Sequence, residues 1–109
     1  MNVKISCCNG KMTAFLSGEI DHHTAREMRK EIDSYAENVH PTLLNLDFSS
    51  VQFMDSSAIG LIMGRYRLMN LIGGYVKVIN VPKHLERLIN ISGVGALGVL
   101  DFKSKDVKV

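Results

Sequence analysis

The segment over residues 59–72 constrains the fold most, because it is apolar around much of a helical surface. A helix of that kind is buried on more than one side. The pair Gly73 and Gly74 ends it by the usual glycine device. Strand-like stretches flank it, with "TLLNLDF" before and "YVKVINV" after. The sequence therefore predicts a β-α-β unit whose helix, over residues 56–72, is the most buried in the molecule.

The same alternation extends along the rest of the chain. The stretches "VKISC" and "KMTAFLSG" alternate in polarity around "CNG", a hairpin turn signal. Thr24 is expected to cap a helix over residues 24–37, with Glu27 completing a capping box. Pro82 starts a third helix, and "VLDF" forms a last short strand. This order predicts an α/β domain with right-handed crossovers, in which helices pack against a mixed sheet of four to five strands.

Length and composition exclude several classes of protein. A chain of 109 residues, 46% of them hydrophobic, supports one domain over residues 1–109, with a flexible tail expected from about residue 102. Thirteen basic residues are scattered among eleven acidic ones, and tryptophan is absent, which argues against nucleic-acid binding. Neither a signal peptide nor a membrane-length apolar run is present. We expect a cytoplasmic monomer that does not bind membranes.

Adjacent polar residues offer little for metal or covalent chemistry. Cys7 and Cys8 are neighbours, which point to opposite faces of a strand and make a poor disulfide. Asp21, His22 and His23 do not form a metal-binding spacing, because adjacent histidines diverge. We therefore expect no metal, no cofactor and no enzymatic activity.

The stretch "FMDSSAIGLIMG", residues 53–64, places two hydroxyls after an aspartate at the start of the apolar helix. Three interpretations compete. A serine at a helix start is most often a cap, which accounts for one of the two serines. A nucleophile elbow needs a glycine before the serine, and this chain has none there. The third interpretation is a phosphorylation site.

A phosphate at this position has a physical logic. A helix N-terminus carries partial positive charge and free N–H groups, so the fold would tolerate the modification. The phosphate would still add about −1.5 to −2 charge units beside Asp55. Such a site can prevent the binding of a partner while the domain itself stays folded.

The sequence resembles a known family at several separated motifs. The run "FMDSSAIGLIMGRYRLMNLIGG", with "GEIDHHTA" upstream and "LINISGVG" downstream, resembles the bacterial anti-sigma factor antagonists with a STAS domain. The likeness spans about residues 10–100. The "DHH" and "GRY" motifs favour the sporulation branch. A general-stress antagonist or a STAS scaffold module is the alternative.

The resemblance implies a mechanism. Antagonists of this family bind an anti-sigma factor that is also a serine kinase, and so free the sigma factor. The kinase uses ATP to phosphorylate the serine directly after the motif aspartate, here Ser56, and a serine phosphatase reverses the step. Ser57 is the competing site. The family usually has glycine at the position of Ala58, so a methyl group is expected to face whatever docks there.

The two motifs also predict a docking surface. "GEIDHH" and the turn at Asp55 and Ser56 follow neighbouring strands, so their ends are expected to lie side by side. Asp21→Ala is expected to weaken binding without changing Tm. The expected partner-binding residues are Asp21, His22, His23, Asp55, Ser56, Ser57 and Ala58.

Overall fold

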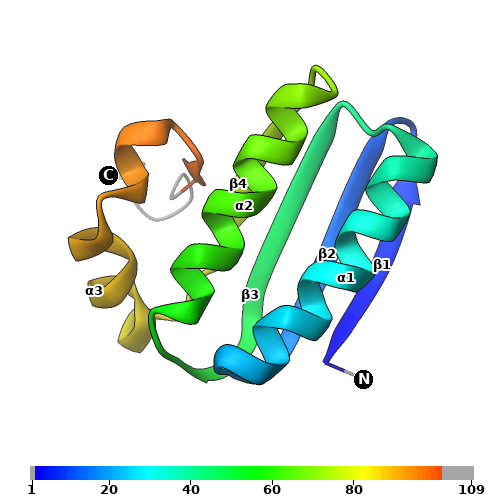
Figure 1. The fold of residues 1–109 in the computed structure, drawn as a ribbon. Coiled ribbons are helices and arrows are strands. Elements are labelled where there is room, and N and C mark those ends of the chain that lie inside the picture. The colour runs from blue at the N-terminus through cyan, green and yellow to red at the C-terminus, as the bar shows by residue number, and fades with distance from the viewer. Residues whose placement is uncertain (1, 102–109) are drawn as a thin grey trace.

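The elements follow the predicted order of strands and helices (Figure 1). The computed structural model describes residues 2–101, so the tail expected from about residue 102 lies outside the described residues. One short 3-10 helix, η1, is present in addition to the predicted elements. In chain order the elements are β1 (Val3–Cys8), β2 (Lys11–Ile20), α1 (His22–Val39), β3 (Leu43–Met54), α2 (Ser57–Leu71), β4 (Tyr75–Ile79), α3 (Lys83–Ser92), η1 (Val94–Leu97) and β5 (Leu100–Asp101).

The strands form one mixed sheet, as expected. Its order is β1-β2-β3-β4-β5, with β1 antiparallel to β2 and every other neighbouring pair parallel. The antiparallel hairpin turns at Asn9 and Gly10, both of which have positive φ. Such φ values are typical of two-residue hairpin loops.

Strand β3 is longer than predicted, and this positions the candidate site. It runs to Met54 rather than stopping near residue 48. Strand β2 follows it through register shifts near Phe15 and Gly18, where Gly18 has φ +77°. The two strands end level, with Ile20 opposite Met54. The turns that follow β2 and β3 therefore leave the sheet side by side.

Helices α1 and α2 lie next to each other across one face of the sheet (Figure 1). Helix α2 buries five side chains, against four in α1 and two in α3, which confirms that it is the most buried helix. Its outer side is nevertheless open to solvent, since Leu71 is 84% exposed and Met63 is 37% exposed. The largest fully buried side chains are Phe48, Met12, Leu16, Ile20, Met28, Ile32, Leu44, Leu46, Ile62, Met69, Ile89 and Val78.

Smaller features agree with or adjust the predictions. Pro82 is the N-cap of α3, one position before the first helical residue, because its extended ψ of 148° lies outside the helix. Cys7 and Cys8 are exposed free thiols. Among the helices of the described residues, none has the length and apolarity that a membrane crossing requires.

Candidate functional site

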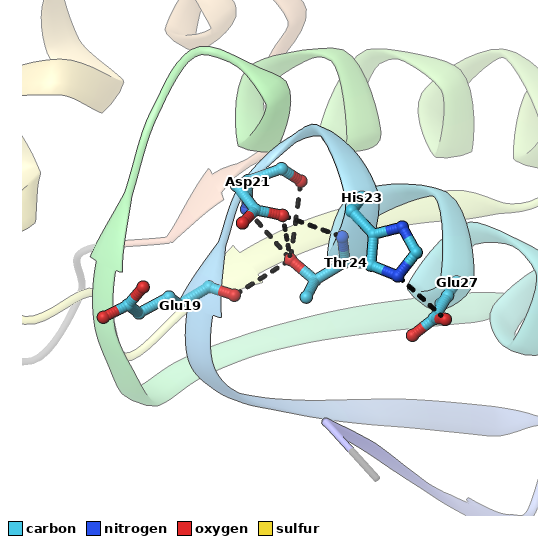
Figure 2. Close-up of polar contacts among 5 residues, drawn as sticks. All are labelled: Glu19, Asp21, His23, Thr24 and Glu27. Carbon is cyan, nitrogen blue, oxygen red and sulfur yellow. Dashed lines mark hydrogen bonds and ion pairs between the residues drawn. The ribbon is translucent and has the colours of Figure 1, made fainter.

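The turn from β2 into α1 is closed by a reciprocal cap (Figure 2). The Asp21 carboxylate accepts the Thr24 N–H at 2.9 Å, and the Thr24 hydroxyl accepts the Asp21 N–H at 2.9 Å. The same hydroxyl donates to the Glu19 carbonyl at 2.9 Å. The predicted cap at Thr24 with Glu27 as its partner is therefore wrong. Aspartate is as good a cap as threonine, and here it starts the helix three residues earlier.

The charged side chains around this turn point in different directions. The Thr24 N–H bond lowers the pKa of Asp21 from its ordinary 3.8, because it stabilises the carboxylate. His23 reaches Glu27, with Nε2 and Oε2 3.4 Å apart, away from Asp21 (Figure 2). His22 instead lies 3.3 Å from an Arg26 amino group. The two histidines diverge as neighbours on a helix do.

The turn from β3 into α2 is capped by Asp55 rather than by a serine. The Asp55 carboxylate accepts the Ser57 N–H at 2.8 Å. Ser56 occupies the N-cap position with helical φ and ψ, and its side chain makes no capping bond. Within residues 2–101, neither serine hydroxyl has a hydrogen-bond partner. The cap interpretation is therefore wrong for both serines.

The first N–H groups of α2 are already bonded. The Ser57 and Ala58 N–H groups donate to Asp55, the first to its carboxylate and the second to its carbonyl at 3.0 Å. Those of Ile59 and Gly60 donate to the Ser56 carbonyl at 3.0 and 3.2 Å. The expectation of free N–H groups for a phosphate is thus wrong. The charge of the helix dipole remains, but the N–H groups of residues 57–60 are not free to bond a group on Ser56.

The two turns form one surface. The Asp55 N–H donates to the Ile20 carbonyl at 3.1 Å, which joins the end of β3 to the end of β2. Asp21, Asp55 and Ser56 are all exposed beside this link. Ala58 is different, because it is 0% exposed. Its methyl group faces the core, so the expectation that it faces a docked partner is wrong.

A groove between α1 and α2 continues from this surface, and the sequence analysis missed it. It encloses about 840 Å³ and begins at His22 and Ser57. Arginines that are scattered in sequence gather along it, namely Arg26, Arg29 and Arg67. We call this feature the α1–α2 groove. The sequence signal for it is the pair Gly60 and Gly64, two glycines four residues apart inside the helix.

An ion pair between a buried arginine and a partly exposed aspartate lines the α1–α2 groove. Arg65, 5% exposed, places Nε 2.8 Å from Asp33 Oδ1 and Nη2 3.2 Å from Asp33 Oδ2. It also donates to the Leu61 carbonyl at 3.3 Å. Burial raises the pKa of Asp33 against the opposing effect of the Arg65 charge, and burial lowers the pKa of Arg65. The pair joins the two helices that carry the site.

Comparison with known proteins gives a consistent answer. Residues 4–104 match the STAS domain family. The anti-sigma F factor antagonist of Paenibacillus polymyxa is 35% identical over 94 residues, which cover 86% of this chain and 80% of that protein. The anti-sigma-B factor antagonist of Bacillus subtilis strain 168 is 27% identical over 105 residues, 96% of this chain and 93% of that protein.

Solved structures of the anti-sigma factor antagonist SpoIIAA have the same fold. The unphosphorylated form has a TM-score of 0.79 at 25% identity and covers 91% of this chain and 85% of its own. The phosphorylated form, from Bacillus, has a TM-score of 0.71 at 25% identity, with coverage of 91% and 88%. The chain is therefore a STAS domain and belongs to the family of anti-sigma factor antagonists.

Proposed function

We propose that this protein binds an anti-sigma factor in its unphosphorylated state, frees the sigma factor, and is switched off by phosphorylation of Ser56. The anti-sigma factor is also the serine kinase, which transfers the γ-phosphoryl group of ATP to the Ser56 hydroxyl and leaves ADP. A serine phosphatase hydrolyses the phosphoserine and resets the switch. The protein acts as a regulatory, non-enzymatic monomer in the cytoplasm.

The observation that carries this proposal is the unused hydroxyl of Ser56. A serine that caps a helix has its oxygen bonded to a backbone N–H. Asp55 takes that role here, so the Ser56 side chain is exposed and bonds to no other residue within 2–101. Transfer of a phosphoryl group to Ser56 therefore breaks no internal hydrogen bond. A kinase reaches the hydroxyl without unfolding the turn.

The phosphate is expected to affect partner binding more than the fold of the domain. The N–H groups of residues 57–60 are already taken, so the first turn of α2 neutralises little of the new charge through backbone bonds. A phosphate adds about −1.5 to −2 charge units next to the exposed Asp55 carboxylate. Negative charge placed opposite negative groups of a partner repels that partner. It also leaves polar groups of the partner without their hydrogen-bonding partners. The domain stays folded while its docking surface changes.

The test uses the anti-sigma kinase, ATP and mass spectrometry, followed by titration calorimetry of each variant. Phosphate is expected on Ser56. Ser56→Ala is expected to escape phosphorylation and still bind, with stability within about 0.5 kcal/mol of the wild type. Ser56→Asp is expected to bind at least about tenfold more weakly, which is about 1.4 kcal/mol.

Two controls make this test specific. Ser50→Asp adds the same charge at an exposed serine of β3 and is expected to leave binding unchanged. Ser57→Ala removes the competing hydroxyl and is expected to leave phosphorylation intact. Phosphate on Ser57 with Ser56 unmodified would contradict the assignment. A phosphorylated protein that still releases the sigma factor would contradict the mechanism.

The branch of the family can be tested separately. The Paenibacillus polymyxa relative, an anti-sigma F factor antagonist, has the higher identity, and this supports a sporulation role. The general-stress role is the alternative, supported by the relative from Bacillus subtilis that aligns over nearly the whole chain. Affinities for an anti-sigma F factor and an anti-sigma-B factor should differ, with tighter binding to the first. The reverse order would assign the protein to the general-stress branch.

A further inference from the structure

The α1–α2 groove is strongly cationic even after the ion pair between Arg65 and Asp33 is counted. Among residues 2–101, Asp33 is the only carboxylate along it, and both oxygens of Asp33 lie against Arg65. Arg26, Arg29 and Arg67 form no ion pair with any carboxylate of residues 2–101. Three cationic side chains thus line the groove with no close ion pair inside the described chain, and only Arg29 is near enough to Asp33 to act on its charge.

The groove is also partly apolar. Leu68 and Leu71 line its α2 side, and Leu71 is 84% exposed. An exposed leucine beside unpaired arginines is a poor match for a sugar–phosphate backbone, which offers charge but no apolar face. It matches an amphipathic helix, whose apolar side packs in a groove while its acidic side meets the cationic rim.

The backbone of α2 is unusually accessible along the same line. A Cβ atom built on Gly60 or Gly64 meets no atom within 4 Å, so packing within the described chain does not require glycine at either position. A glycine inside a helix destabilises that helix relative to alanine. Both glycines line the groove, and so they leave room there for another chain.

We propose that the α1–α2 groove is a second docking site, which binds an acidic amphipathic helix of the anti-sigma factor. This inference rests on the proposed function, because the groove begins at His22 and Ser57. It is therefore continuous with the exposed surface of Asp21, Asp55 and Ser56, which we call the switch surface. The switch surface responds to phosphate, whereas the groove adds affinity and orientation through the arginines. Binding therefore depends on two separable regions of the domain.

The experiment removes the groove charges and leaves the switch intact. The test variant is Arg29→Gln/Arg67→Gln. The control is Lys4→Gln/Lys11→Gln, which lowers the net charge by the same amount. Both control lysines are exposed on the face of the sheet opposite the helices. The affinity of each unphosphorylated variant for the anti-sigma factor is measured at several salt concentrations. The groove variant is expected to bind about tenfold more weakly and with a shallower salt dependence. The control variant is expected to bind within twofold of the wild type, a range of about 0.4 kcal/mol.

Further variants separate the explanations. Arg29→Lys/Arg67→Lys keeps both charges and is expected to recover most of the affinity, and Arg67→Gln alone is expected to show part of the loss. Equal affinity of the groove and control variants would overturn the inference. Loss of self-association in sedimentation, with unchanged affinity for the anti-sigma factor, would assign the groove to a second copy instead.

The failure of the proposed function has a distinct signature. If wild-type protein fails to bind the anti-sigma factor, the proposed function falls, and the groove inference falls with it. If Ser56→Asp loses binding while the groove variant does not, the switch stands and only the groove inference is overturned.

Discussion

Two aspartates at the ends of neighbouring strands decide what the nearby hydroxyls can do. Asp21 and Asp55 each accept a backbone N–H at the start of a helix. The Thr24 hydroxyl is used in the first turn, where it bonds to Asp21 and Glu19. The Ser56 hydroxyl is left unused in the second. Both turns are capped by aspartate, and they differ in the nearby hydroxyl: that of Thr24 is held by hydrogen bonds, whereas that of Ser56 is available for modification.

The cap at Asp21 revises the expectation that Asp21→Ala leaves Tm unchanged. Alanine leaves the Thr24 N–H without its acceptor, so Tm is expected to fall on the order of 5 °C. Asp21→Asn keeps the cap and removes only the charge, so its Tm should stay close to wild type. Thermal melts of both variants check this, and an equal Tm for the two would contradict it. Asp21→Asn is also the cleaner variant for testing a role of the Asp21 charge in binding.

The pH dependence of this cap has a definite sign. The pKa of Asp21 is lowered in the folded state, so its contribution to stability is fully present above 3.8. It is lost as pH falls through the lowered pKa. Urea unfolding of wild type and Asp21→Asn is therefore expected to show the wild type losing stability relative to the variant below about pH 3.8. A difference that stays constant with pH would contradict the role of the ionised carboxylate.

At the scale of elements, α2 combines a buried side with an open side that lines the α1–α2 groove. Ala58 and Ile62 are fully buried, whereas Gly64 faces the α1–α2 groove with free space around it. A helix meant only for packing gains nothing from that glycine. Its presence is explained when a second chain approaches the backbone there.

Gly64→Ala tests whether this glycine serves binding at the expense of stability. The free energy of unfolding is expected to rise by about 0.5–1 kcal/mol, because alanine is the better helix former and its methyl group meets nothing. Affinity for the anti-sigma factor is expected to fall. Gly73→Ala is the contrasting control, since Gly73 has φ +83° and alanine there is expected to destabilise the fold. A stabilised Gly64→Ala protein with full affinity would contradict the groove inference.

At the scale of the molecule, the ion pair between Arg65 and Asp33 joins the two helices that carry the site. The two partners differ in access to water, since the Asp33 side chain is 26% exposed and that of Arg65 only 6%. Removing Asp33 leaves a buried cation without a counter-charge, whereas removing Arg65 leaves a carboxylate that water can reach. The pair therefore contributes to stability unequally from its two sides.

This inequality is measurable by urea unfolding. Asp33→Asn is expected to destabilise the fold by about 3 kcal/mol, the lower end for a stranded buried charge. Arg65→Met, which keeps the length of the side chain, is expected to cost at least about 1 kcal/mol less than this. A larger loss for Arg65→Met would show that the guanidinium bond to the Leu61 carbonyl outweighs the ion pair.

Much of the fold was predictable from local pattern. Alternation of polarity marked the strands, and the apolar run over residues 59–72 marked the most buried helix. The right-handed crossover rule then placed the helices in relation to a mixed sheet. Element ends were less predictable, because Asp21 and Thr24 are both acceptable caps and only the reciprocal bonds of the folded turn choose between them.

The sequence by itself determined the order of the elements, the family motif and the neighbouring positions of Asp21 and Ser56. These depend on periodicity and on adjacent strands, which are properties of short segments. Only the tertiary structure decided that Ala58 points into the core, that the first N–H groups of α2 are taken, and that arginines from two helices line one groove. Asp33 and Arg65 are 32 residues apart in sequence and meet only when α1 and α2 pack together. Contacts at such separations are set by packing across the whole core, which no local pattern of residues encodes.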